Sequence, residues 1–579
     1  MKISHLAPFP IMIALVVMAC HKDNLDQPPL GQLPEADIAN KKGVEGLLIG
    51  AYSQLDGIST NVFGWGGSGS NWIYGSICGS EAYKGSYELD QEDIHALEVF
   101  IPTANNGMLA DKWKAVYAGV QRANTVLRVL KKATDIKPND RQRIAAEARF
   151  LRAHYHFEAI KMWGHVPFVD ENVTYESDNF YLPNDTLIWP AIEDDFRFAM
   201  NNLPITMEAV GRANKYAAEA FLAKAYMFQH KYDLARPLLQ DLIQNGVTAG
   251  GVPYGLLKNF ADNFNPATKN SSESVFAVQN SVNDGSNGFN GNVGDVLNWP
   301  GNGGPGGCCG FFRPSQYLVN HFKTDPQTGL PDLDHFNDNN VSNDEGYLSS
   351  DFFTPYPGTL DPRLDWTVGR RGIPYRGWGP HPGQDWTIPQ DYGGPYSPIK
   401  NTYSKEQQAG LSDASFWTSG STATNINLIR FADLLLWAAE AEVEAGSLEM
   451  AREYVNRIRR RAHNPDGFVK KDDGTPAANY KVEEYTTPWT DPSFARKAIR
   501  YERMLELAME GHRFFDLVRW GIADTEINGY FNKEKNLRNY MNSAVFTKNK
   551  NEVFPIPQTQ IDLSVSPAGK LLMKQNPGY

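Results

Sequence analysis

The sequence feature that most constrains the fold is the segment at residues 143–169, RIAAEARFLRAHYHFEAIKMWGHVPFV, which has the pattern of a long helix followed by a turn. Apolar side chains recur at helical spacing at Ile144, Ala148, Leu151, Tyr155 and Met162. The other side of this helix carries Arg149, Arg152 and Lys161. Because the side chains of its many alanines are short, a neighbouring helix can approach closely. Such helices usually occur in stacked pairs.

Helical periodicity returns in other segments, at 35–55, 108–132, 188–202, 215–245, 434–461 and 492–520. Two of them repeat the small-large pattern of a tetratricopeptide repeat, because the step from Ala225 to Ala235 recurs from Ala441 to Ala451. We therefore predict a mostly α-helical protein in which tetratricopeptide-like helix pairs form a superhelical scaffold.

The segment from 250 to 423 breaks this pattern, since it is rich in glycine and contains several tryptophans. Loops of this length within an ordered chain are usually functional or disordered, and the tryptophan content argues against disorder. We predict a long, irregular, loop-rich insertion that packs against the helical body and binds ligand.

Charge and motifs exclude several function classes. Lys and Arg number 55 against 67 Asp and Glu, a formal net charge of −12, which argues against a nucleic-acid partner. The glycine-rich run at 64–69 has no strand before it and no helix after it, so it is not a dinucleotide site. The acidic run at 332–339 lacks the glycine and the closing glutamate of a calcium loop. We expect no cofactor and no bound metal.

The N-terminal residues predict export. An apolar run at 11–17 is too short to span a membrane and leads to Val17-Met18-Ala19-Cys20, after which the chain becomes polar. We interpret residues 1–19 as a signal peptide, Cys20 as the lipidated first residue of the mature chain, and 20–34 as a flexible tether. The alternative is an ordinary cleaved signal with a chance cysteine.

The other cysteines are Cys78, Cys308 and Cys309, which form neither a disulfide framework nor a zinc pattern. A bond between Cys308 and Cys309, or between one of them and Cys78, is open. We favour unpaired cysteines packed as small residues in a glycine-rich loop.

The aromatic loop at 63–87 is the predicted ligand surface, because flat rings stack on the C–H faces of sugars and polar groups bind the hydroxyls. The aromatic candidates are Trp65, Trp72 and Tyr74, joined by Trp299 and Trp378 from the insertion. The polar candidates are Asn71, Glu81 and Arg313. We expect these loops to lie off the helical core, so that removing Trp72 or Trp299 weakens binding without unfolding the chain.

The run from Glu510 to Gly521 joins Glu, His, Arg and Asp at helical spacing, with Glu510 and Arg513, and Asp516 and Arg519, close enough to pair. We interpret it as a buried network of ion pairs and hydrogen bonds that holds the last helices, and not as a catalytic site.

Several short motifs together resemble the SusD/RagB family of outer-membrane lipoproteins from the polysaccharide utilisation systems of Bacteroidetes. They are Cys20 with Asp23, Leu25 and Asp26; Phe150-Leu151-Arg152-Ala153 with Gly164-His165-Val166-Pro167; Asp361-Pro362-Arg363-Leu364; Leu428 to Asp433 with Ala439-Glu440-Ala441; Glu502-Arg503 with Glu510 to Leu517 and Arg519-Trp520-Gly521; Phe554 to Gln558; and Asn576 to Tyr579. Their number and order cover most of the mature chain.

The resemblance implies a body of four tetratricopeptide-like helix pairs, tethered to the outer membrane and exposed at the cell surface, that captures nutrient and passes it to a SusC-like TonB-dependent transporter. Gly79-Ser80-Glu81-Ala82 looks like the family segment near the ligand surface, which favours Glu81. Ligand-binding residues vary within the family, so no fixed set carries over.

The predicted organisation is a single body at 35–579, with helical repeats at about 35–249 and 424–521 and the insertion at about 250–423. We expect a non-enzymatic glycan-binding protein. The alternatives are capture of peptides or another non-sugar nutrient, and a lipoprotein glycoside hydrolase, which needs two carboxylates facing one cleft.

Overall fold

The computed structural model describes residues 35–579 except 59–63, 176 and 302, and within them most of the regular structure is helical. The longer helices are α3 (Lys41–Ser53), α5 (Gly107–Lys132), α6 (Pro138–Trp163), α7 (Trp189–Asn202), α8 (Lys215–Phe228), α9 (Tyr232–Asn245), α14 (Phe431–Ala445), α15 (Leu448–His463), α16 (Pro492–Leu507) and α18 (Ala523–Glu534). The shorter ones are α2 (Glu35–Ile38), α4 (Glu92–Glu98), α10 (Gln316–His321), α11 (Gln384–Thr387), α12 (Gln390–Gly393), α13 (Gln408–Leu411), α17 (Arg513–Arg519), α19 (Gln558–Leu563) and a π-helix, η3 (Trp72–Ile77). The predicted mostly α-helical fold is confirmed.

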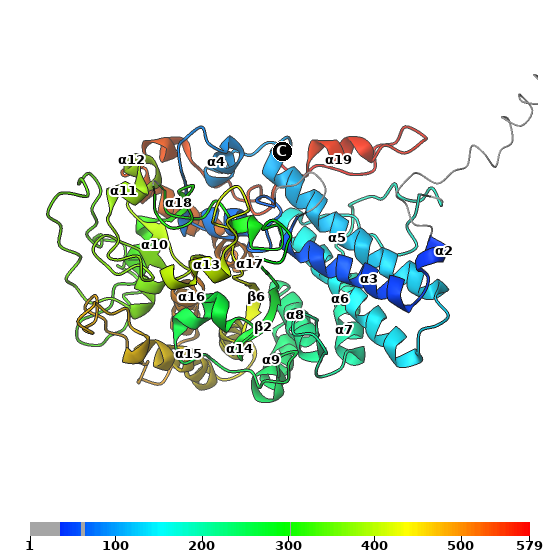
Figure 1. Cartoon of the computed structure of the whole chain (residues 1–579), viewed down its shortest axis with the longest axis horizontal. Coiled ribbons are helices and arrows are strands. Elements are labelled where there is room, and N and C mark those ends of the chain that lie inside the picture. The colour runs from blue at the N-terminus through cyan, green and yellow to red at the C-terminus, as the bar shows by residue number, and fades with distance from the viewer. Residues whose placement is uncertain (1–34, 59–63, 176, 302) are drawn as a thin grey trace, which may run out of the picture.

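Consecutive helices pack against one another from α5 to α9, and α9 then packs against α14, which contacts α15 and α16. In Figure 1 this series begins with α3, α5, α6 and α7 on the right and continues through α8, α9, α14, α15 and α16 along the lower edge. The two predicted repeat pairs, α8 with α9 and α14 with α15, are therefore neighbours in space although about 200 residues of sequence separate them. Ala225, Ala235, Ala441 and Ala451 are all buried.

Helix α6 packs between α5 and α7, which cover it on two sides. The predicted apolar stripe is buried, and α5 approaches closely because a Cβ at Gly119 would lie 2.5 Å from the ring of Tyr155. The prediction that Arg152 lies on a polar face was wrong. Its guanidinium is buried and bonded to Asp195 of α7 at 2.7 Å and to Asn124 of α5 at 3.1 Å.

The structure has three two-stranded antiparallel sheets, of which the first two below join the insertion to the rest of the chain and the third lies within it. They pair β1 (Ala82–Gly85) with β3 (Phe311–Pro314), β2 (Ser274–Val278) with β6 (Ile426–Arg430), and β4 (Val368–Gly369) with β5 (Ser397–Pro398). Strand β6 runs directly into α14. The loops of the insertion and the short helices α10 to α13 lie on the left in Figure 1, beside the C-terminal half of the scaffold.

The helix predicted at 492–520 is broken between α16 and α17. Met509 and Gly511 have φ of 65° and 77°, in the left-handed region. The segment around η3 holds this break, since Met509 N–H donates to Glu81 Oε2 and Gly511 N–H donates to Ser76 Oγ, each at 3.0 Å. A Cβ at Gly75 would lie 1.8 Å from the Gly511 carbonyl oxygen, so the two backbones touch.

A buried ion-pair network joins the pieces. The carboxylate of Glu506 on α16 accepts bonds from Arg430 at the end of β6, from Arg461 on α15, and from Arg363 in the insertion, at 3.0 Å in the case of Arg363. All four side chains are buried, and Arg430 also donates to Glu273 at 2.9 Å.

The predicted network at 510–521 is present, with one exchange of partners. Asp516 and Arg519 pair at 2.8 Å as expected. Glu510 pairs instead with Arg430, because the break after α16 turns its carboxylate away from Arg513. Arg513 pairs with Glu526 of α18.

We expect Glu506→Gln to lower the free energy of unfolding by about 3–5 kcal/mol, because it leaves buried guanidinium groups without their counter-charge. Denaturant titration measures this difference. The control is Asp466→Asn, which removes a surface ion pair with Lys258 and should leave stability unchanged. Equal effects of the two substitutions would contradict a central role for Glu506.

Candidate functional site

The predicted aromatic loop is part of the core. Trp72 lies in η3 with its ring edge-on to Phe311 and Phe312, and its indole N–H donates to the Gly294 carbonyl at 3.0 Å. Tyr74 donates its hydroxyl proton to the Met108 carbonyl at 2.7 Å. The expectation that this loop lies off the core was wrong, because glycines let its backbone pack directly against its neighbours.

Removal of a buried ring of this size typically costs about 3–5 kcal/mol, so loss of Trp72 or Trp299 would destabilise the chain. Trp299 is buried beneath the 303–310 loop and packs against Tyr403, with ring centroids 4.8 Å apart. Trp65 is partly buried and packs against the main core.

The predicted polar residues are also buried and bonded to protein. Arg313 donates to the carbonyl oxygens of Gly310, Thr387, Ile388 and Pro389, and burial lowers the pKa of its guanidinium to about 9. Asn71 donates to Glu158 at 3.0 Å. The Arg313 contacts hold segments of the insertion together, and the Asn71 contact lies within the helical part of the chain, so the donors that we expected to meet a ligand are bonded to protein.

Of the predicted residues, Trp72 and Trp378 keep a place at an open site. Trp72 lines the pocket described below. Trp378 is partly exposed, and its ring centroid lies 6.3 Å from that of Tyr403. The Lys405 ammonium lies 5.7 Å from the ring centroid of Trp378.

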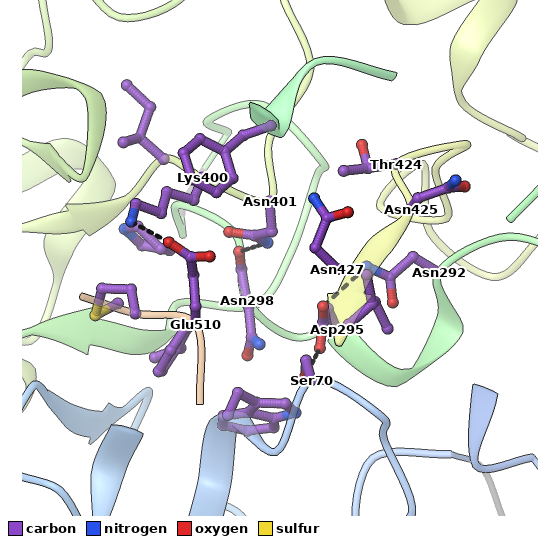
Figure 2. Close-up of a pocket in the computed structure, with 17 residues that line it drawn as sticks. Ser70, Asn292, Asp295, Asn298, Lys400, Asn401, Thr424, Asn425, Asn427 and Glu510 are labelled. Carbon is purple, nitrogen blue, oxygen red and sulfur yellow. Dashed lines mark hydrogen bonds and ion pairs between the residues drawn. The ribbon is translucent and has the colours of Figure 1, made fainter. Parts of the chain in front are cut away.

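A pocket of about 70 Å³ lies where β6, the segment after β5 and the break between α16 and α17 meet. We call it the asparagine pocket. It is lined by Ser70, Trp72, Phe264, Asn292, Asp295, Asn298, Phe312, Pro398, Ile399, Lys400, Asn401, Thr424, Asn425, Ile426, Asn427, Met509 and Glu510. In Figure 2 the side chain of Asn298 is drawn between Glu510 and Asp295.

Charged groups in the asparagine pocket are compensated by protein partners. The Lys400 ammonium donates to Glu510 at 2.7 Å. Burial by itself would raise the pKa of Glu510, but Arg430 and Lys400 lower it to about 2. Asp295 accepts from Ser70 at 2.6 Å and from Asn292 at 2.8 Å, and its burial raises the pKa of its carboxyl above the usual value.

Several acceptors on side chains that line this pocket have no donor among the described residues. Asn292 Oδ1, Asn298 Oδ1 and Thr424 Oγ1 are buried and make no hydrogen bond to any described residue. Buried polar atoms are nearly always paired with protein, water or ligand, so these atoms indicate a place for a molecule that donates protons.

An aromatic patch lies beside this pocket and escaped the sequence analysis. It consists of Phe289 (54% exposed), Trp417 (56% exposed) and Phe416 between them, with centroid separations of 5.5 Å and 6.0 Å from Phe416. The sequence signal is a Phe-Trp pair in a run of serine, threonine and glycine.

Two hydrogen bonds join the segment around Phe289 to the segment that follows Trp417. Asn292 N–H donates to the Thr422 carbonyl at 2.8 Å, and Ser421 Oγ donates to the Gly288 carbonyl at 2.7 Å. The Cα atoms of Phe289 and Asn292 are at most about 11 Å apart, because only three peptide units separate them.

The structure corrects the favoured state of the cysteines. Cys308 and Cys309 form a vicinal disulfide, and Cys78 is free and buried. Cys20 lies outside the described residues. No cluster of three metal-ligating side chains occurs in the described part of the chain, and no helix there has the length and apolar character needed to span a bilayer.

Comparison with known proteins agrees with the architecture. A family model described as the SusD family matches residues 272–579, and one described as "Starch-binding associating with outer membrane" matches residues 68–227. SusD-like protein P2 of Formosa agariphila is 23% identical over 587 residues, with 98% of each chain covered. SusD-like protein P25 of the same organism is 23% identical and covers 88% of this chain and 89% of its own.

Solved structures share the fold at similarly low sequence identity. A laminarin-binding SusD-like protein has a TM-score of 0.63 and 22% identity, over 93% of this chain and 100% of its own. Surface glycan-binding protein A of Bacteroides thetaiotaomicron, in complex with laminarihexaose, has a TM-score of 0.62 and 20% identity, over 93% of this chain and 99% of its own.

The fold defines a helical-repeat protein that carries a loop-built surface on a tetratricopeptide-like scaffold. The chain belongs to the SusD family.

Glu81 provides a test of the structural role of the predicted site. Burial raises the pKa of this carboxyl to about 8, whereas an unfolded glutamate loses its proton near pH 4.3. The folded chain therefore holds one more proton between these values, and its stability falls as pH rises. We expect Glu81→Gln to gain stability relative to the native chain by up to about 1.4 kcal/mol per pH unit between pH 5 and 8.

Denaturant titrations at several pH values measure this slope, and Glu208→Gln, at an exposed position, controls for the loss of one carboxyl. A difference between Glu81→Gln and the native chain that does not change with pH would show that Glu81 is ionised in the folded state.

Proposed function

We propose that this protein captures glycan on the surface formed by the aromatic patch and the asparagine pocket. The observation that carries the proposal is the position of two exposed rings, Phe289 and Trp417, beside uncharged polar side chains with unpartnered acceptors. Sugar residues offer C–H faces to the rings and hydroxyl protons to the acceptors. Trp378 extends this surface, because Tyr403 lies against it and donates its hydroxyl proton to the Ser419 carbonyl at 3.4 Å.

Family membership supports the proposal. Two structural neighbours, one a laminarin-binding SusD-like protein and one in complex with laminarihexaose, share the fold over most of the chain. Capture of peptides on the same surface is the alternative outcome of the binding experiments below.

The geometry also supports a non-enzymatic role. A glycoside hydrolase needs one carboxyl that is protonated at working pH and a second that is ionised. Of the two carboxyls in the asparagine pocket, Glu510 is held ionised by Arg430 and Lys400, which lower its pKa to about 2, and it is already bonded to both. Its oxygens are therefore committed to these two cations and are not free to act as the nucleophile or the base, so the raised pKa of the Asp295 carboxyl finds no working partner.

For the cellular setting we propose a lipoprotein of the outer membrane that passes its ligand to a SusC-like TonB-dependent transporter. The Val17-Met18-Ala19-Cys20 run and the polar segment after it support acylation at Cys20, with residues 1–19 removed and 20–34 as the tether. The description of the family model at 68–227 supports the same location.

We expect Trp417→Ala to weaken glycan binding at least tenfold, about 1.4 kcal/mol, because it removes a central stacking face. The melting temperature should not change, since the ring is largely outside the core. Retardation gels and titration calorimetry against a polysaccharide panel measure the affinity. Tyr175→Ala, at an exposed ring in another part of the chain, is the control. Native affinity in Trp417→Ala would place the glycan site elsewhere.

In cells, we expect the native chain to fractionate with the outer membrane and to co-purify in mild detergent with a large TonB-dependent transporter. Cys20→Ser should abolish membrane retention, because the acyl anchor is lost. Retention of Cys20→Ser in the membrane would contradict acylation at this residue, and a native preparation without the transporter would contradict the partnership.

A further inference from the structure

We propose that the asparagine pocket selects uncharged glycans, whose only polar groups are hydroxyl and ether oxygens, and rejects glycans that carry uronate or sulfate groups there. The inference rests on the proposed glycan capture and names the ligand class of that site. It follows from the charge balance of the pocket, the chemistry of its free atoms and its size.

The pocket offers no cation to an anionic sugar. Its one lysine, Lys400, is buried, bonded to Glu510 at 2.7 Å and placed 4.5 Å from the ring centroid of Phe264. Arg430, behind Glu510, is occupied by Glu273, Glu506 and Glu510. An anion that took Lys400 as its partner would deprive the buried Glu510 of a counter-charge, which is strongly unfavourable.

The remaining charges in the pocket repel an anion. Glu510 is balanced by Lys400 and Arg430, whereas Asp295 has no cationic partner among the described residues and accepts only from Ser70 and Asn292 and, more weakly, Ser68. At short range in a partly buried site, like charges repel one another more strongly than they do in water. The whole chain carries a formal net charge of −12, so its long-range field also disfavours the approach of a polyanion.

The free hydrogen-bonding atoms fit hydroxyl groups. Asn292 Oδ1, Asn298 Oδ1 and Thr424 Oγ1 have no protein donor, and each can accept a proton from a ligand. A sugar hydroxyl donates as well as accepts, whereas a carboxylate or sulfate only accepts. An anionic group can accept from the Thr424 hydroxyl but has no proton to donate to the carboxamide oxygens of Asn292 and Asn298.

The volume limits what enters. A space of about 70 Å³ is far below the roughly 300–1,000 Å³ of a site that encloses a whole small ligand. The pocket takes the edge of one sugar residue while neighbouring residues lie on Phe289 and Trp417. A substituent on that sugar residue therefore contacts the lining residues of the pocket directly.

The test compares matched polysaccharides on affinity gels and by calorimetry. Laminarin, amylose, xyloglucan and galactomannan are each paired with a carboxymethylated form, and with a hydroxyethylated form that adds similar bulk without charge. Alginate and polygalacturonate complete the panel. We expect at least one neutral parent to bind, its hydroxyethylated form to bind within about threefold, and its carboxymethylated form to bind at least tenfold more weakly.

The dependence on salt provides a second readout. Binding of the neutral parent should be nearly constant between about 20 and 500 mM NaCl, because no ion pair forms with the ligand.

Thr424→Val links the selectivity to the pocket. Its hydroxyl oxygen has no protein partner, so an isosteric methyl group should not lower the melting temperature. Affinity for the neutral glycan should fall about 3- to 10-fold, the effect of one hydrogen bond. Thr206→Val, at an exposed position outside the pocket, is the control and should bind like the native chain.

The outcomes separate the two proposals. Equal or tighter binding of a carboxymethylated form, binding that weakens steeply with salt, or unchanged affinity in Thr424→Val would overturn the selectivity and leave glycan capture in place. Failure of every neutral and anionic polysaccharide to bind would overturn glycan capture itself.

Discussion

The buried carboxylate of Glu506 is the point on which the architecture depends. It is fully enclosed and receives guanidinium groups from β6, from α15 and from the insertion, so three parts of the chain far apart in sequence share one counter-charge. Burial would raise the pKa of this carboxyl, but the surrounding arginines, Arg461 and Arg430 foremost, hold it well below its usual value. A buried carboxylate and buried arginines are each costly to leave alone, and the network specifies how the insertion meets the helices.

The same network determines the character of the asparagine pocket. Arg430 bonds Glu506 on one side and Glu510 on the other, and Glu510 in turn binds Lys400, which lines the pocket. The charged groups of the structural network are thus paired with one another and are not free to bind a ligand. What remains there is a set of carboxamide and hydroxyl groups, some of them unpartnered, next to exposed rings. Stability and ligand chemistry are therefore linked through Arg430.

Whether an aromatic residue is buried or exposed could not be predicted from the sequence. Trp72 and Trp417 both occur in runs rich in glycine and serine, and local composition does not distinguish them. Trp72 is buried because η3 packs against the break after α16 and against Phe311 and Phe312. Trp417 is exposed because Phe416, its neighbour, takes the inward position against Gly288. Which ring faces solvent depends on contacts between segments more than a hundred residues apart.

The sequence by itself determined the helical scaffold, its repeat pairs, the loop-rich insertion and the family, because these depend on periodicity and on short motifs within one segment. It also indicated the ion-pair network at 510–521, although not that Glu510 pairs with Arg430. Only the tertiary structure decided the ligand surface. The asparagine pocket forms where β6, the segment after β5 and the break after α16 meet. Its free acceptors are those to which no described segment brings a donor. The periodicity within one segment does not predict which distant segments meet.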